Sequence, residues 1–139
     1  MSKIAVVYWS GTGNTATMAV AVPEGAKSAG ADVDLLTASE FNSSLVAGYD
    51  AIAFGCPAMG AEVLEETEFQ PMFDEVISSL SGKKIGLFGS YGWGSGEWME
   101  DWENTSRSAG ANVIATVMAN NAPGEEDVDN CKSLGRSLA

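Results

Sequence analysis

The strongest constraint on this chain comes from three uninterrupted apolar runs, at residues 4–9, 51–56 and 85–89. None of them alternates apolar with polar residues, which is the pattern of a strand with one wet face. Continuous runs of this length are typical of strands buried on both faces, as in a parallel sheet covered by helices. Residues 33–36 and 113–118 are candidates for flanking strands of the same sheet.

Helix-length segments separate these strands. The first begins near Asn14 and ends before Gly30, the second covers residues 69–80, the third begins near Gly96 and ends before Gly110, and the last covers about 127–139. Strands that alternate with helices predict right-handed crossovers and an open, doubly wound α/β sheet. Pro23 lies inside the first helix, so we expect a kink there or a break near Val22.

The bulk composition fits one globular domain over residues 1–139. No apolar run approaches the roughly 18 residues that span a membrane, and the start of the chain does not resemble a signal peptide, so we expect a cytoplasmic protein. Its two cysteines do not form a metal-type cluster, and we predict no metal site. Cys56 ends an apolar run and is interpreted as a small buried residue.

The charge balance restricts the possible partners. The chain has 19 acidic and 7 basic residues, no histidine, and a formal net charge of −12. Such a field repels nucleic acid and anionic membranes and attracts basic protein surfaces. Composition alone leaves open whether the acidic surface serves docking or only solubility.

The turn after the first strand carries the first functional motif, SGTGNT at residues 10–15. Glycines let backbone N–H groups converge, and the N-terminus of the following helix adds a positive dipole end. The P-loop lysine and the G-x-G-x-x-G pattern are both absent, which argues against an NTPase and against a dinucleotide fold. The segment predicts a site for one terminal phosphate held by neutral donors; an ordinary tight turn with a helix cap is the alternative. Its residues are Ser10, Gly11, Thr12, Gly13, Asn14 and Thr15.

Two further loops come to the same edge, because ligands of doubly wound sheets bind beyond the carboxyl ends of the strands. Trp93 lies between two glycines, which is a poor place for a core residue and a good place for a ring that stacks on a ligand. Met59 offers a polarisable surface opposite. We therefore predict a planar ring between Met59 and Trp93; a surface tryptophan for partner binding is the alternative. The candidate residues of the two loops are Pro57, Ala58, Met59, Gly60, Ala61, Glu62, Ser90, Tyr91, Gly92, Trp93 and Gly94.

Three motifs in this order, VYWSGTGNT (7–15), GCPAMG (55–60) and LFGSYGWGSGEWM (87–99), closely resemble the short-chain flavodoxins of anaerobic bacteria such as clostridia. The resemblance covers essentially the whole chain. It implies a flavodoxin-like five-stranded parallel sheet in the order 2-1-3-4-5, with helices on both faces and FMN as the cofactor. Ala61 departs from the pattern, since some relatives carry Asp there.

The resemblance also implies roles for individual residues. Segment 10–15 would hold the phosphate, while Met59 and Trp93 would flank the isoalloxazine ring. Backbone groups of residues 60–62 and of Gly92 would address the polar edge of the ring, and the Glu62 carboxylate would accept from its N3–H. Asn120, after the last strand, is expected to reach the ribityl chain.

The implied function is one-electron transfer at low potential, between semiquinone and hydroquinone, by a monomer with no catalytic residue of its own. It would substitute for ferredoxin-type donors and serve basic-surfaced reductases and oxidoreductases that use ferredoxin or flavodoxin. The Gly60–Ala61 peptide would flip so that the Gly60 carbonyl accepts from the reduced ring. Nearby acids would disfavour the fully reduced anion. These acids are Glu62, Glu65, Glu66, Glu68, Glu97, Glu100, Asp101 and Glu103.

Two other functions are alternatives on this kind of fold. An FMN-dependent NAD(P)H:quinone reductase on the same fold needs a pocket for a second organic substrate, and the short loops here leave little material for one. A receiver-like signalling domain needs a phosphorylatable Asp at the end of the third strand. This chain has Gly55-Cys56-Pro57 there, which argues against a receiver.

Overall fold

A single sheet of five parallel strands, in the order β2-β1-β3-β4-β5, organises the protein. The computed structural model describes residues 2–11, 13–59, 63–92 and 94–139. The five-stranded parallel sheet confirms the predicted α/β class and strand order. The strands are β1 (Lys3–Tyr8), β2 (Asp32–Thr37), β3 (Ala51–Gly55), β4 (Lys84–Tyr91) and β5 (Asn112–Asn120). The helices are α1 (Asn14–Ser28), α2 (Ser43–Val46), α3 (Phe69–Val76), α4 (Glu97–Ser108) and α5 (Glu125–Leu138), with short 3₁₀ turns at Ala38–Glu40 and Ile77–Ser79.

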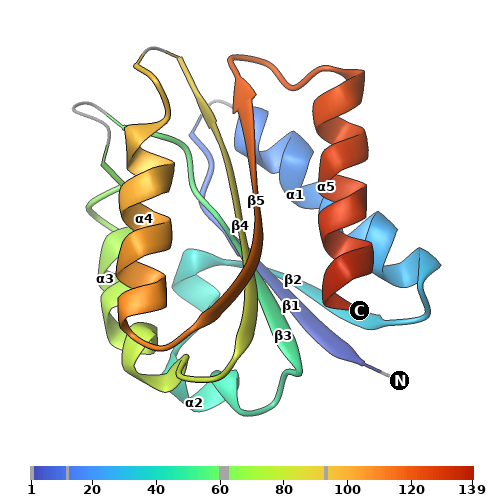
Figure 1. Ribbon diagram of the computed structural model, residues 1–139, viewed down its shortest axis with the longest axis vertical. Helices are drawn as coiled ribbons and strands as arrows, with labels where there is room; N and C mark the ends of the chain where they lie inside the picture. Colours follow the sequence, from blue (N-terminus) through green and yellow to red (C-terminus); the bar gives the residue numbers. More distant parts are fainter. Residues whose placement is uncertain (1, 12, 60–62, 93) are drawn as a thin grey trace.

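Helices cover both faces of the sheet, as its continuous apolar strands require. Figure 1 shows α1 and α5 side by side on one face and α3 and α4 on the other. Successive residues of β1 point to opposite faces: Ala5 and Val7 pack in the core under α3 and α4, and Ile4 and Val6 pack in the core under α1 and α5. No helix of the described residues is long and apolar enough to span a membrane.

Helix α1 corrects one expectation. It runs without a break from Asn14 to Ser28, with Pro23 inside it, so the break predicted near Val22 is wrong. Proline in a helix interior costs about 3 kcal/mol. Here Pro23 is buried, and Val22 packs in one core cluster with residues of α5 and the sheet; this apolar burial offsets that cost.

Strand β4 is longer than its apolar run predicts. The sequence predicts a loop at Ser90 and Tyr91, but they pair with Ala119 and Asn120 of β5 and continue the strand. The pairing with β5 extends β4 to Tyr91 because neighbouring ladder bonds, and not apolarity, decide where a strand ends. The longer strand carries Tyr91 to the edge at which the predicted site lies.

Candidate functional site

A cavity of about 270 Å³ opens at the carboxyl edge of the sheet, close to the lower end of the roughly 300–1,000 Å³ range of small-molecule sites. Segments that follow β1, β3, β4 and β5 all contribute to it, because parallel strands end at one edge. Its lining residues are Trp9, Gly11, Asn14, Pro57, Ala58, Met59, Ser90, Tyr91, Gly92 and Asn121.

Most of the described residues that the sequence predicts for the site line this cavity. Trp9 and Asn121 line it but were not predicted, whereas Asn120 was predicted and is not among the lining residues. The predicted residues Thr12, Gly60, Ala61, Glu62 and Trp93 lie outside the described part of the chain. The other predicted residues that do not line the cavity are Ser10, Gly13, Thr15 and Gly94.

The turn before α1 has the geometry of an anion site. Gly13 adopts φ 96° at the start of the helix, and no acidic residue occurs in the first helical turn. The Ser10 hydroxyl oxygen accepts from the N–H groups of Gly13 and Ala16, both at 3.2 Å. A hydroxyl that accepts through its lone pairs keeps its own O–H as a donor. The same turn therefore caps the helix and presents neutral donors beside its positive end.

Thr15 joins the turn before α1 to the end of β4. Its side chain is buried, and its hydroxyl lies 3.1 Å from the Ser90 hydroxyl. The Ser90 N–H also donates to Thr15 Oγ1 at 3.4 Å. These bonds join the first turn of α1 to the end of β4, so Thr15 fixes the phosphate turn against the strand that carries Tyr91.

The segment after β3 is tied to its surroundings by backbone bonds. Ala58 N–H donates to Ser90 O at 3.0 Å, and Met59 and Val63 exchange two N–H···O bonds of 2.8 and 3.1 Å. Cys56 is fully buried, as predicted, and burial raises the pKa of its thiol to about 12. A thiol with so high a pKa stays protonated at neutral pH, so Cys56 is a packing residue and not a nucleophile.

Glu65 belongs to the framework of the site and not to its acidic surface. The carboxylate is buried and accepts from the N–H groups of Thr67, Glu68 and Phe69 at 2.7–2.8 Å, and from the Thr67 hydroxyl. Burial opposes the charge and raises the pKa of Glu65, but these hydrogen bonds outweigh it and lower the pKa to about 2. The carboxylate thus satisfies N–H groups at the start of α3.

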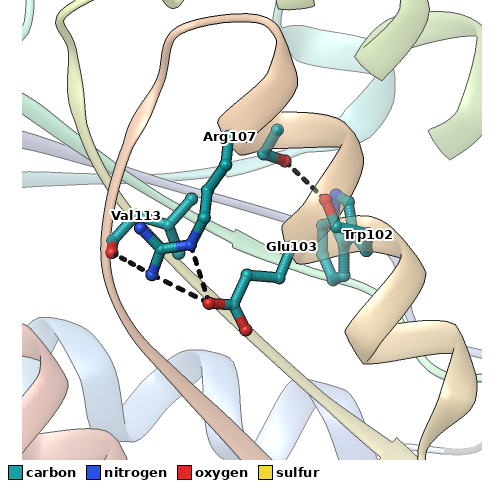
Figure 2. Close-up of polar contacts among 5 residues, drawn as sticks. Trp102, Glu103, Arg107 and Val113 are labelled. Carbon is teal, nitrogen blue, oxygen red and sulfur yellow. Dashed lines mark hydrogen bonds and ion pairs between the residues drawn. The ribbon is translucent and has the colours of Figure 1, made fainter.

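Glu103 forms a salt bridge with Arg107 of the same helix, as Figure 2 shows. The Arg107 guanidinium donates to Glu103 at 2.9 Å and to the Val113 carbonyl at 2.9 Å, which joins α4 to β5. Of the acids expected near the site, Glu66, Glu68, Glu97, Glu100 and Asp101 are exposed. We call these five residues, which lie in α4 and in the segment before α3, the acidic surface.

The loop after β5 explains why Asn121 and not Asn120 lines the cavity. Asn121 adopts φ 59°, a left-handed conformation that asparagine tolerates better than most residues. Its N–H donates to Tyr91 O at 2.7 Å, which turns the chain at the cavity rim. The Asn120 amide lies toward the same carbonyl, at 3.5 Å. The local signals for this turn are an Asn-Asn pair at the end of the strand and the Pro123-Gly124 pair that follows.

The ring of Trp9 is the other unpredicted part of the cavity. A Cβ added to Gly11 would lie 3.0 Å from it, so the indole packs over the glycine of the phosphate turn. The site then combines an uncharged anion turn with the flat or soft side chains of Trp9, Tyr91 and Met59. None of the described residues that line the cavity carries a charge, and an aromatic ring with one phosphate fits this donor set.

Comparisons with known proteins match this chain to flavodoxins over nearly its full length. A family model described as flavodoxin matches residues 6–135. The chain is 47% identical to the flavodoxin of Megasphaera elsdenii over 98% of both chains, and 44% identical to that of Clostridium beijerinckii over 96% of this chain and 97% of the relative. The solution structure of two-electron reduced M. elsdenii flavodoxin superposes with a TM-score of 0.90, covering 97% of each chain.

Proposed function

This chain belongs to the flavodoxin family, and we propose that it shuttles single electrons at low potential between the semiquinone and hydroquinone levels of its cofactor, in place of ferredoxin-type donors. The cofactor is FMN, and the protein is an electron carrier and not an enzyme. The observation that carries the proposal is the cavity itself, which sets an uncharged phosphate turn beside aromatic walls. The flavin supplies the electron chemistry when bound, and the chain supplies binding, orientation and electrostatics.

The phosphate would be held by segment 10–15. The N-terminus of α1, with no acid in its first turn, provides a positive end, and Ser10 provides a hydroxyl donor. No lysine or arginine lies between Lys3 and Lys27, so selectivity for a single terminal phosphate comes from neutral donors.

Met59 and Trp93 would flank the ring, with backbone groups of residues 60–62 at its polar edge. We propose that Gly60 turns its carbonyl toward the ring when the ring takes up an electron and a proton. Only glycine reaches the required backbone conformation at little cost. The adjoining residues favour such a local movement, because Met59 and Val63 are bonded to each other across the intervening segment.

The acidic surface would serve two purposes. Its charges disfavour a second negative charge on the ring, which lowers the second reduction potential. They would also attract basic-surfaced reductases and oxidoreductases that use ferredoxin or flavodoxin. The formal net charge of −12 supports this role, and we propose a cytoplasmic monomer that forms transient complexes.

The test is ligand selectivity followed by reductive titration. The apoprotein should bind one FMN, and riboflavin far more weakly, because riboflavin leaves the phosphate turn empty. Dithionite titration of the holoprotein should give two separated one-electron steps, and NADPH with a quinone should give negligible turnover. Equal affinity for FMN and riboflavin by fluorescence quenching would contradict the phosphate assignment, and a single two-electron step would contradict the shuttle.

A further inference from the structure

Trp98 in α4 does not line the cofactor cavity, but it contacts the lining residue Tyr91 and Cys56, the residue before the lining residue Pro57. Its side chain is 1% exposed. The indole Nε1–H donates to the Cys56 carbonyl at 3.2 Å, and the ring lies 5.5 Å from the Tyr91 ring at an interplanar angle of 44°. Cys56 directly precedes Pro57, the first residue of one wall, and Tyr91 belongs to the other.

The Cys56 carbonyl is held in a narrow space. A Cβ on Gly89 would lie 2.1 Å from that oxygen and 3.1 Å from the Trp98 ring, so the backbone of β4 approaches both groups closely. The backbone N–H of Cys56 donates to Phe88 O at 3.1 Å, so the N–H and the carbonyl of Cys56 are both hydrogen-bonded. The indole bond therefore fixes the direction in which the chain leaves β3.

Behind this segment lies a second cavity, of about 150 Å³, between α3 and α4. Val63 and Leu64 line it together with Phe73, Trp98 and Trp102. A segment backed by a hollow loses dispersion contacts on that side. Hydrogen bonds therefore matter to the position of this loop, and among the described residues the bond from Trp98 to the Cys56 carbonyl joins α4 to the residue that leads into it.

We propose that Trp98 is a positioning residue for electron transfer: through the Cys56 carbonyl it holds Pro57, Ala58 and Met59, which line the cavity, in the position that the reduced cofactor requires. This inference rests on the proposed function. A contact made only after reduction needs closer alignment than packing against the oxidised ring. Loss of the tether therefore weakens binding of the reduced cofactor more than binding of the oxidised cofactor, and the first reduction potential falls.

The experiment compares Trp98→Phe with Trp102→Phe in the FMN-loaded protein. Trp102 is a matched control: it lies one turn further along α4, lines the same hollow, is 3% exposed, and its Nε1 has no hydrogen-bond partner among the described residues. Both substitutions remove one pyrrole ring, but only Trp98→Phe removes a hydrogen bond. We expect Trp98→Phe to weaken the binding of one-electron-reduced FMN about three- to tenfold more than the binding of oxidised FMN. A tenfold difference corresponds to a fall of about 59 mV in the first reduction potential.

A second readout does not depend on electron transfer. Amide hydrogen exchange at Ala58 and Met59, whose N–H groups donate to Ser90 O and Val63 O, should be faster in Trp98→Phe than in Trp102→Phe. Equal potentials in the two variants would overturn the inference, even if FMN affinity differed, because a merely structural role lowers affinity in every redox state alike. Failure of the wild-type protein to bind FMN would instead refute the proposed function.

Should Trp98→Phe fail to fold, site-specific replacement of Trp98 by benzothienylalanine keeps the shape of the indole and removes only its N–H. The same fall in potential and the same faster exchange are expected relative to wild type. Wild-type values for both would overturn the inference.

Discussion

The α-carbon of Gly25 in α1 faces the main-chain carbonyl of Lys132 in α5 so closely that a Cβ on Gly25 would lie 1.9 Å from the oxygen. The contact is reciprocal, since a Cβ on Gly135 in α5 would lie 2.0 Å from the Val22 carbonyl oxygen. The two helices thus pack backbone against backbone, and α1 is the helix that begins at the phosphate turn.

Gly25→Ala should therefore destabilise the protein, although alanine is normally about 1 kcal/mol better than glycine inside a helix. Forcing α5 away from α1 should cost about 1–3 kcal/mol, measured by urea unfolding. Val20→Ala, at an exposed position of the same helix, should change stability by less than about 0.5 kcal/mol. A stabilised Gly25→Ala variant would show that the helices are not in backbone contact.

Glu65 should make the free energy of unfolding depend on pH in the acid range. Its pKa is about 2 in the folded state and 4.5 for the free group, so its stabilisation is fully present above pH 4.5 and is lost as pH falls toward 2. The shift corresponds to about 3 kcal/mol. Glu65→Gln should remove this part of the acid sensitivity, whereas Glu66→Gln, at an exposed position, should keep it. Superimposable stability profiles for wild type and Glu65→Gln between pH 2 and 5 would contradict the role of the carboxylate as a cap.

Gly60→Ala tests the redox-linked turn. A Cβ should cost about 1–2 kcal/mol in the conformation that points the carbonyl at the reduced ring, so the first potential should fall by tens of millivolts while oxidised FMN stays bound. Gly30→Ala is the control, because Gly30 has φ 91° with no atom within 4 Å of an added Cβ. It should lose stability and keep the wild-type potential. An unchanged potential in Gly60→Ala would place the switch elsewhere in the 57–62 segment.

Reduction by a basic-surfaced reductase should slow as salt is raised, because screening weakens the attraction of an acidic surface. Asp101→Asn on α4 should slow association several-fold at low ionic strength and flatten the salt dependence. Asp32→Asn removes the same charge at the start of β2, on the opposite edge of the sheet, and should have little effect. Stopped-flow rates that do not vary with ionic strength would show that the acidic surface is not a docking surface.

The architecture and the place of the site can be derived from the amino-acid sequence alone. Apolar runs such as 51–56 need no partner to be recognised as doubly buried strands. Once the strands are parallel, their carboxyl ends must share an edge, and Gly11, Met59 and Tyr91 meet there. Local composition was sufficient because each of these signals is carried by neighbouring residues.

The contacts that hold the site in place come from tertiary packing. Nothing in the local sequence distinguishes Glu65 from Glu66. Yet the Glu65 carboxylate is buried at the start of α3, and Glu66 is exposed. The continuity of α1 through Pro23 depends on α5, and the bond from Trp98 to Cys56 joins residues 42 positions apart. Such contacts depend on which elements pack together, and no local pattern records the partner that a distant segment supplies.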